Sequence, residues 1–265
     1  MDQPIDLNRM PYQLDGGIGL RARIGLIVLA TDHTIEHEWR QIFRELDGVA
    51  LYGSRIWNDA TITPETLRAM ASRLSDSAAV IMPGVPLASI AFGCTSATMV
   101  IGEDGVFTKL RAARPEARPT TPITAAFAAF RAFDVQRLAV LTPYRADVNA
   151  TVKAYIEARG FEVPLFGTFD EEDDHRAARI SSASIRDAAV ALGRDPGVDA
   201  VFVACTSLRV ANIAAEIEQA IGKPVTSSNH AMAWHVLRLA GVEDPLPQWG
   251  KLFAIGSLPP PIGRP

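Results

Sequence analysis

Short apolar runs alternate with amphipathic stretches along most of this chain. The runs lie at Arg23–Ala30, Val49–Ile56, Ala88–Gly93, Arg137–Thr142, Phe161–Gly167, Ala200–Ala204 and Pro224–Ser227. A continuous apolar run of this length is typical of a strand buried on both faces, and such strands belong to parallel sheets. Strands that alternate with helices therefore predict an α/β fold, in which helices flank parallel sheets.

The stretches between these runs carry helix signals. Helices are predicted over Thr34–Leu46, Thr63–Leu74, Pro122–Phe133, Asp147–Gly160, Ser181–Leu192 and Arg209–Ile221. Thr63 suits an N-cap because Pro64 follows it at the first helical position. Asp147 is expected to cap the fourth of these helices, which Gly160 ends.

The segment Gly102–Pro122 interrupts this pattern with three arginines and three prolines. It is predicted to cross between two lobes, with its arginines on the surface or in a contact between subunits. The order of strands and helices restarts after it. The predicted first lobe comprises residues 20–120 and 229–265, the second lobe comprises residues 121–228, and residues 1–19 form an N-terminal arm.

The two halves of the chain carry the same motif at matching places. Cys94 and Cys205 each follow an apolar strand directly, and each is followed by Thr-Ser. This repetition indicates an internal duplication. In open α/β sheets, binding sites form at the carboxyl ends of the strands. Two facing lobes would therefore place one thiol on each side of a single cleft.

Composition and charge narrow the classes of function. The chain has 265 residues, of which 48% are hydrophobic and 21% charged, with a net charge of −4, so neither nucleic acid nor an anionic membrane is a predicted partner. The beginning of the sequence lacks the apolar core of a signal peptide, and no apolar run approaches the ~20 residues of a membrane-spanning helix. A cytoplasmic location is expected. Two cysteines are too few for a disulfide framework or a zinc ribbon.

A pair of facing thiols suits acid–base chemistry. One thiolate could remove a proton from a carbon while the opposite thiol returns one to the other face, which is the geometry of a racemase that needs no cofactor. The same pair could act as nucleophile and acid. Hydroxyl and backbone N–H groups beside the thiols would hold carboxylates, at Thr95, Ser96, Thr206 and Ser207.

Three motifs carry a resemblance to a known group of enzymes. They are Gly93-Cys94-Thr95-Ser96-Ala97, Ala204-Cys205-Thr206-Ser207-Leu208, and the block from Pro224 through Ser227-Ser228-Asn229 to Trp234. They resemble the aspartate/glutamate racemase superfamily, in the branch of maleate cis-trans isomerases, arylmalonate decarboxylases and ectoine-utilisation protein A. The resemblance runs from about Arg23 to Leu239. It implies two pseudo-symmetric Rossmann-like lobes with the active site between them, no metal or organic cofactor, and a homodimer or homotetramer.

Within this branch the chain resembles maleate isomerases most in its cysteines. Arylmalonate decarboxylases have Gly in place of the first cysteine, so Cys94 disfavours decarboxylation. Maleate isomerases keep both cysteines, the first resembling a nucleophile and the second an acid, together with a tyrosine that Tyr144 matches. They carry Asn where this chain has Asp32 and, in a looser alignment, a second Asn where it has Asp174.

These two aspartates bear on the substrate. Replacing Asn with Asp introduces an anion, which repels a dicarboxylate. We therefore hypothesise that Asp32 faces an ammonium or amide N–H, so that the small carboxylate substrate is amino-acid-like. The ectoine-utilisation relatives suggest a diaminobutyrate derivative. Three alternatives stay open: isomerisation of maleate through a covalent adduct on Cys94, decarboxylation, and a two-lobed binding protein without turnover.

A competing motif points to zinc. His33-Thr34-Ile35-Glu36-His37 matches the H-x-x-E-H string of inverted zinc peptidases. Two histidines four residues apart would share one face of a helix. The string nevertheless stands where a helix starts after a buried strand, with Thr34 as a candidate N-cap. No metal is therefore predicted.

Overall fold

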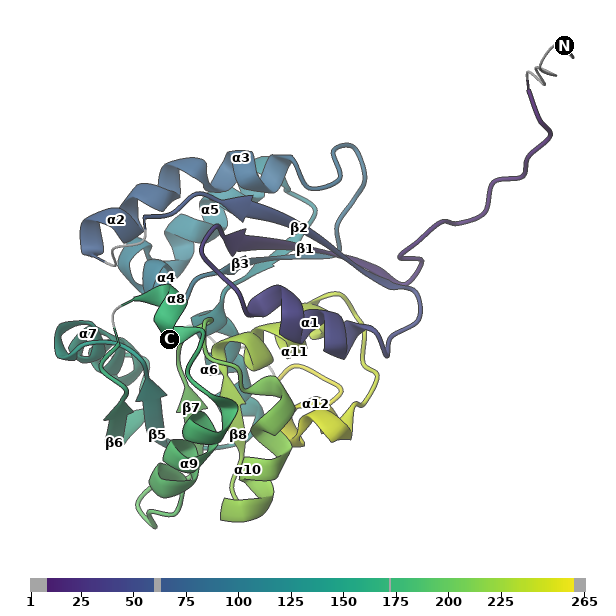
Figure 1. Cartoon of the computed structure of the whole chain (residues 1–265). Coiled ribbons are helices and arrows are strands. Elements are labelled where there is room, and N and C mark those ends of the chain that lie inside the picture. Colours follow the sequence, from purple (N-terminus) through teal and green to yellow (C-terminus); the bar gives the residue numbers. More distant parts are fainter. Residues whose placement is uncertain (1–8, 60–62, 172, 260–265) are drawn as a thin grey trace, which may run out of the picture.

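The computed structural model describes residues 9–59, 63–171 and 173–259, and contains two four-stranded sheets in which every strand pair is parallel. The first sheet and its helices comprise β1 (Ala22–Leu29), α1 (Ile35–Phe43), β2 (Val49–Ile56), α2 (Pro64–Ala69), η1 (Met70–Arg73), α3 (Leu74–Ala79), β3 (Ser89–Gly93), α4 (Thr95–Ile101), α5 (Glu103–Ala113) and β4 (Arg118–Thr120). Figure 1 shows this sheet above the second one.

The second sheet is built in the same way. Its elements are α6 (Pro122–Ala132), β5 (Arg137–Thr142), α7 (Ala146–Glu157), β6 (Glu162–Thr168), α8 (Asp174–Ala177), α9 (Ser182–Gly193), β7 (Ala200–Val203), η2 (Ala211–Ile213), α10 (Ala214–Ile221) and β8 (Val225–Ser227). The chain then continues through α11 (Ser228–Leu239), η3 (Pro247–Trp249) and α12 (Lys251–Ala254).

The strand orders confirm the predicted two-lobed α/β fold. They are β2-β1-β3-β4 in one sheet and β6-β5-β7-β8 in the other, so each strand of the first sheet has a counterpart four strands later. Cys94 follows β3, and Cys205 comes after its counterpart β7, separated from it by Ala204 alone. The central strands β1, β3, β5 and β7 are almost wholly buried, which is why their sequences are apolar on both faces.

Helix α6 lies between the two hydrophobic cores. Its phenylalanines Phe127 and Phe130 pack with β5 and β7, whereas Ala125 and Ala129 pack with β1 and α11. Helix α11 is buried along almost its whole length and packs against α6 and β3. The proposed boundaries of the lobes at residues 120 and 229 therefore fall beside two helices that join the lobes, and these boundaries stay a prediction.

One of the three predicted helix caps agrees with the structure and two differ. Thr63 caps α2 as expected, in a reciprocal pair of hydrogen bonds with Thr66. Asp147, by contrast, lies in the first turn of α7, whose N-cap is Arg145. The side chain of Thr34 does not cap α1; instead Oδ1 of Asp32 accepts hydrogen bonds from the backbone N–H groups of Thr34 and Ile35, at 2.7 and 2.9 Å.

The prediction of a crossover over Gly102–Pro122 is wrong for most of that segment. It forms α5 and the edge strand β4, and the chain leaves the first sheet only at α6. Arg114, which was expected on the surface or in a contact between subunits, is buried, with 5% of its area exposed. Its guanidinium donates to the carbonyl groups of Ile81, Met82 and Val85, so it fixes the loop that leads into β3.

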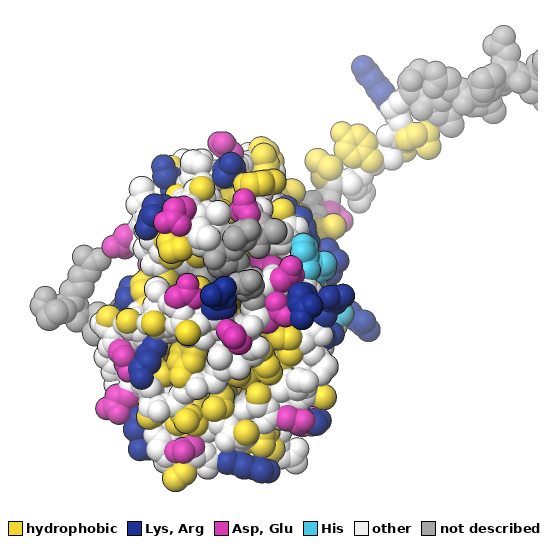
Figure 2. Space-filling model, turned by 60° about the vertical axis from the view of Figure 1, so that its left-hand side comes forward, with side chains coloured by type: hydrophobic (Ala, Val, Ile, Leu, Met, Phe, Trp, Pro, Cys, Tyr) yellow, Lys and Arg dark blue, Asp and Glu magenta, His cyan; other side chains and the backbone are white. Residues whose placement is uncertain are grey.

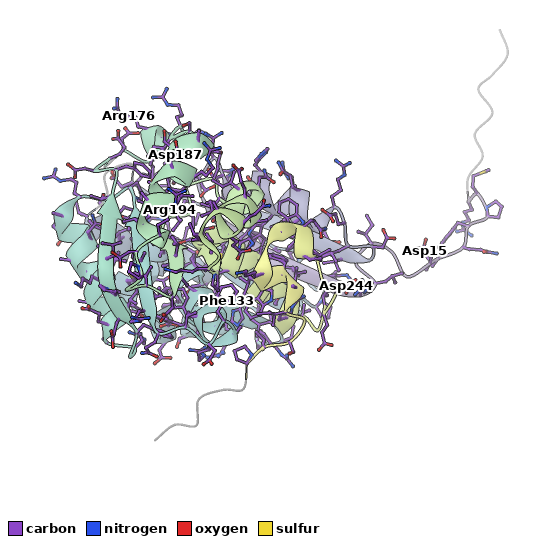
Figure 3. All side chains as sticks on the ribbon, turned by 90° about the horizontal axis from the view of Figure 1, so that it is seen from below. Asp15, Phe133, Arg176, Asp187, Arg194 and Asp244 are labelled. Atoms are coloured by element: carbon purple, nitrogen blue, oxygen red, sulfur yellow. The ribbon has the colours of Figure 1, made fainter. Side chains whose placement is uncertain are left out.

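The described part of the N-terminal arm, from residue 9 to β1, extends away from the body of the protein (Figure 1). Its large apolar side chains are exposed, as the yellow atoms in Figure 2 show; they belong to Met10, Tyr12, Leu14, Ile18 and Leu20. In Figure 3 Asp15 lies out on the arm, whereas Asp244 lies near its base, where it forms an ion pair with Arg21. Among the described helices, none combines the length and apolar character needed to span a bilayer.

Candidate active site

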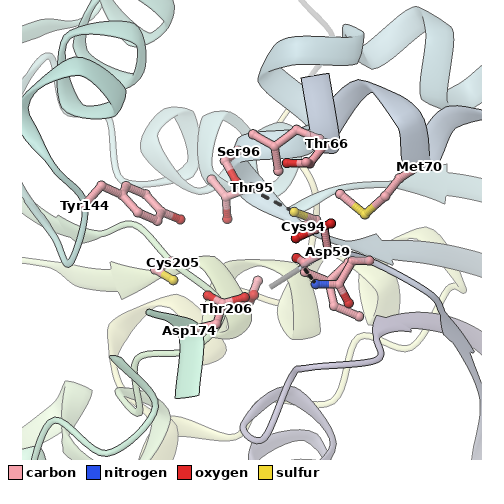
Figure 4. Close-up of a pocket in the computed structure, with 13 residues that line it drawn as sticks. Asp59, Thr66, Met70, Cys94, Thr95, Ser96, Tyr144, Asp174, Cys205 and Thr206 are labelled. Atoms are coloured by element: carbon pink, nitrogen blue, oxygen red, sulfur yellow. Dashed lines mark hydrogen bonds between the residues drawn. The ribbon is translucent and has the colours of Figure 1, made fainter. Parts of the chain in front are cut away.

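The carboxyl ends of β3 and β7 face one pocket between the two sheets, and both cysteines line it (Figure 4). The lining consists of Leu29, Asn58, Asp59, Thr66, Leu67, Met70, Cys94, Thr95, Ser96, Tyr144, Asp174, Cys205 and Thr206. Seven of the nine residues predicted for the site are thus brought together. Asp32 and Ser207 lie just outside this lining.

Cys94 is held at the junction of β3 and α4. It is the N-cap of α4, and its Sγ accepts a hydrogen bond from the backbone N–H of Ala97 at 3.4 Å. The hydroxyl of Ser96 lies 3.8 Å from the same sulfur atom. At the preceding residue, Gly93, an added Cβ would lie 2.6 Å from the terminal methyl group of Ile35 and 3.2 Å from the carbonyl oxygen of Ile27, so a larger residue there would displace Ile35. Close packing of β3 against α1 therefore fixes the position of the thiol.

Cys205 occupies the equivalent place after β7. Its Sγ accepts from the backbone N–H of Ser207 at 3.4 Å, and its own N–H donates to Oγ of Ser228 at 3.1 Å. The same Ser228 hydroxyl lies 2.8 Å from Oγ1 of Thr95. Ser228, the first residue of α11, therefore links the two cysteine loops. The Ser227-Ser228-Asn229 motif is visible in the sequence, but the role of Ser228 depends on contacts with distant segments, which no local pattern reveals.

Both thiols are strongly held in the protonated form. Burial raises the pKa of Cys94 to about 12, against the opposing contacts of Ala97 and Ser96. Burial also raises the pKa of Cys205 to about 12, and the carboxylate of Asp174 acts in the same direction on both thiols. Because a thiolate is the reactive form, a bound substrate must change the electrostatics of this pocket before either sulfur can act as a base or nucleophile.

Tyr144 lies on the second lobe at the side of Cys205 (Figure 4). Its hydrogen bond to the Cys205 thiol lowers the pKa of that thiol. Burial is the main reason why the pKa of Tyr144 lies well above its usual value, and the neighbouring sulfur atoms act in the same direction. The loop is fixed by Asn149, which donates to the carbonyl oxygen of Tyr144 and accepts from the hydroxyl of Thr142. Tyr144 is thus a neutral hydroxyl donor aimed at the pocket.

Asp174 and Asp32 differ in position. Asp174 begins α8 in the second lobe and lines the pocket. The Asp32 carboxylate is buried beside the pocket, where it caps α1, and burial raises its pKa to about 6. Ser207 stands behind the lining, and its hydroxyl donates to Oδ1 of Asp174 at 3.4 Å.

A buried network behind the pocket was not predicted. Both backbone N–H groups at Val210 and Ala211 donate to Oε1 of Glu38 at 2.7 Å, and the amide of Asn229 donates to Oε2 at 2.8 Å. Burial raises the pKa of Glu38 to about 7. The only sequence signal was a charged residue on the apolar face of α1, where a buried partner is needed.

The two histidines of the zinc-like string do not converge. His33 lies before α1 and its Nε2 is 2.7 Å from Nδ1 of His175 in the second lobe. His37 lies within α1 and contacts Gln41 at 2.8 Å. In the parts of the chain that the structure describes, no three His, Cys, Asp or Glu side chains cluster as metal ligands would.

Comparison with known proteins agrees with this geometry. The family model described as arylmalonate decarboxylase matches residues 25–253. The maleate isomerase of Nocardia farcinica is 28% identical over 89% of this chain and 96% of its own. The arylmalonate decarboxylase of Bordetella bronchiseptica is 31% identical over 51% of this chain and 57% of its own.

Solved structures show the same relationship. A cysteine-to-alanine variant of the maleate isomerase of Pseudomonas putida S16, bound to maleate, superimposes with a TM-score of 0.81 at 24% identity, over 89% of this chain and 98% of that one, which shows the shared fold. A variant of the Nocardia farcinica maleate cis-trans isomerase that carries a covalent succinylcysteine intermediate gives a TM-score of 0.79 at 27% identity, over 88% and 98% of the two chains. The chain therefore belongs to the arylmalonate decarboxylase family, and within it is similar to maleate isomerases over almost its whole length.

Proposed function

We propose that this protein is a cofactor-independent isomerase that acts at a carbon next to a carboxylate, with Cys94 and Cys205 as its catalytic residues. The observation that carries the proposal is the presence of one thiol from each lobe in a single pocket. Neutral donors surround them: the hydroxyls of Ser96 and Tyr144 and the backbone at the two Thr-Ser motifs. These groups suit the carboxylate oxygens of a small substrate.

In the favoured reaction, the thiolate of one cysteine removes the proton from the α-carbon, so that a C–H bond breaks and an S–H bond forms. The electron pair is delocalised into the adjacent carboxylate. The opposite thiol then donates its proton to the other face of the carbon and becomes the thiolate. Each cysteine is thus the base for one enantiomer and the acid for the other. A racemase acting on an amino-acid-like carboxylate, such as a diaminobutyrate derivative, is the finer form of this proposal.

A second candidate is maleate cis-trans isomerisation, which the full-length maleate isomerase relatives favour. There the Cys94 thiolate would add to one carbon of the double bond while Cys205 protonates the other. Rotation about the resulting single bond and loss of the thiolate and proton would then give fumarate. The succinylcysteine intermediate of the Nocardia farcinica relative supports this chemistry.

A substrate panel in deuterated water, followed by NMR, separates these reactions. Racemisation exchanges the α-hydrogen for deuterium in an amino acid, maleate isomerisation yields the single vinyl signal of fumarate, and decarboxylation loses a carboxyl carbon. We expect Cys94→Ser and Cys205→Ser each to lower turnover by about 10²-fold or more. If the protein binds small carboxylates but turns none of them over, and if neither Cys94→Ser nor Cys205→Ser changes that binding, the protein is a binding protein instead.

A further inference from the structure

The pocket around the thiols is acidic. Two acidic residues, Asp59 and Asp174, line it, and none of the remaining described lining residues is acidic. No described lining residue is Lys, Arg or His. A dicarboxylate such as maleate would bring two further negative charges beside the carboxylate of Asp174, and like charges repel.

Asp174 is built into this pocket rather than left at a surface. It lies on the second lobe, and its Oδ2 accepts a hydrogen bond from Oγ1 of Thr31, on the first lobe, at 3.2 Å. Its Oδ1 accepts from Ser207. Burial raises the pKa of Asp174, and the two hydroxyl contacts oppose that shift by favouring the ionised form. These two hydroxyl donors favour the anionic form of a carboxylate that lies between the two sheets (Figure 4).

This anion works against the chemistry of the thiols. The charge of Asp174 contributes to the raised pKa of Cys94, of Cys205 and of Tyr144. An enzyme that needs a thiolate here would gain from a positive charge beside Asp174, because that charge would cancel the repulsion between the carboxylate and the sulfur. His175, the exposed residue that follows Asp174, favours the ionised carboxylate from outside the pocket. Within the described lining no Lys, Arg or His side chain supplies that charge, so a charged substrate is the source that the pocket itself admits.

We propose that Asp174 is the specificity-determining residue of this site, and that it binds a positively charged nitrogen of the substrate. The site then takes carboxylates that carry an ammonium group in preference to dicarboxylates. This assigns to Asp174, which lines the pocket, the role that the sequence suggested for Asp32, which does not line it. The proposal rests on the proposed function, since it concerns the substrate of the same two thiols.

The consequence is a substrate-activated site. The ammonium pairs with Asp174, the pocket loses its excess of negative charge, and a thiol can then ionise next to the substrate carbon. Substrate recognition and thiol activation are thereby coupled through one carboxylate. Dicarboxylates lack this coupling and leave both sulfur atoms protonated.

The test compares Asp174→Asn with Asp170→Asn, a matched control from the exposed loop between β6 and α8 that does not line the pocket. The ligands are succinate, L-aspartate and L-2,4-diaminobutyrate, which have equal carbon chains and increasingly positive charge. Binding is measured by isothermal titration calorimetry. In the wild-type protein we expect the dissociation constant of diaminobutyrate to be at least tenfold lower than that of succinate.

In Asp174→Asn we expect that ratio to fall at least tenfold, and Asp170→Asn to keep the wild-type ratio. A wild-type preference for succinate, or an unchanged ratio in Asp174→Asn, would overturn the proposal. Without any ligand, alkylation of both cysteines in Asp174→Asn should shift to lower pH, and an unshifted profile in a folded variant would also contradict it. Failure of the proposed function is distinguishable: ligand selectivity would persist while no substrate of the NMR panel turns over.

Discussion

At the scale of single residues, Tyr144 and Asp174 act on the thiols in opposite directions. The hydroxyl of Tyr144 lowers the pKa of Cys205 through a hydrogen bond, whereas the carboxylate of Asp174 raises it through its charge. The reactivity of the site is thus a balance between one neutral donor and one anion. Tyr144→Phe removes the donor and Asp174→Asn removes the charge, and each substitution keeps the shape of the side chain.

Tyr144→Phe removes the donor. Since the hydrogen bond favours the Cys205 thiolate, its loss should move the alkylation profile of Cys205 to higher pH, with an alkylation rate lower by about tenfold for each unit of pKa. The profile of Cys94, on which Tyr144 has no such contact, should change little. Mass spectrometry after timed treatment with iodoacetamide reads the two cysteines separately. Equal shifts at both sites would mean that Tyr144 acts on the pocket as a whole and not through its hydrogen bond.

At the scale of elements, α1 connects the first lobe to the loop that carries Cys205. Thr34 donates to the carbonyl oxygen of Ser207 at 2.9 Å, and Glu38 accepts from the N–H groups at the start of η2. Asn229 completes the connection by donating to Glu38 and to the carbonyl oxygen of Thr206. The buried carboxylate of Glu38 thus holds the loop that follows Cys205 in place, although Glu38 itself does not line the pocket.

Glu38→Gln should flatten the pH dependence of stability. The pKa of Glu38 is about 7 in the folded protein, above the usual 4.5, so the folded state binds this proton more tightly than the unfolded state. The free energy of unfolding therefore falls as pH rises from about 4.5 to 7. Urea unfolding at pH 5 and pH 8 should show a loss on the order of 1–3 kcal/mol from this residue in the wild type. That loss should be absent in the variant.

Asp32 contributes a change of the same sign in both proteins, since burial raises its pKa to about 6. The control is Glu36→Gln, which alters a half-buried residue of the same helix that pairs with Arg55. It should keep the wild-type difference between pH 5 and pH 8. An equal difference in Glu38→Gln would show that the titration of Glu38 does not contribute to stability.

The sequence predicted elements better than contacts. The strands β1, β3, β5 and β7 are recognisable because burial on both faces leaves a local apolar signature, and the two Cys-Thr-Ser motifs locate the pocket through the same strands. The partners of Glu38, and the Thr31 partner of Asp174, lie more than 140 residues away in the chain, so no local pattern reveals them. Asp32 and Asp174 also look alike in sequence, and only the fold shows which of them lines the pocket.

At the scale of the whole molecule, the lobes meet through α6, α11 and the polar contacts around the pocket, while the described residues of the arm take no part in that core. The family match begins at residue 25, after the arm. Assembly as a homodimer or homotetramer stays a prediction. The exposed apolar side chains of the arm, including Tyr12 and Leu14, make it the segment whose removal best separates folding from assembly.

A variant that lacks residues 1–20 should therefore fold as the full chain does. It keeps Arg21, which pairs with Asp244 at the base of the arm, and the whole of β1. Because the deleted side chains of the described part, such as Met10 and Leu14, are exposed, we expect the free energy of unfolding in urea to change by less than about 0.5 kcal/mol. A loss above about 2 kcal/mol at equal subunit composition would show that the arm packs on its own core. Light scattering on both proteins provides that composition, and a smaller assembly in the variant would assign the arm's apolar residues to the contact between subunits.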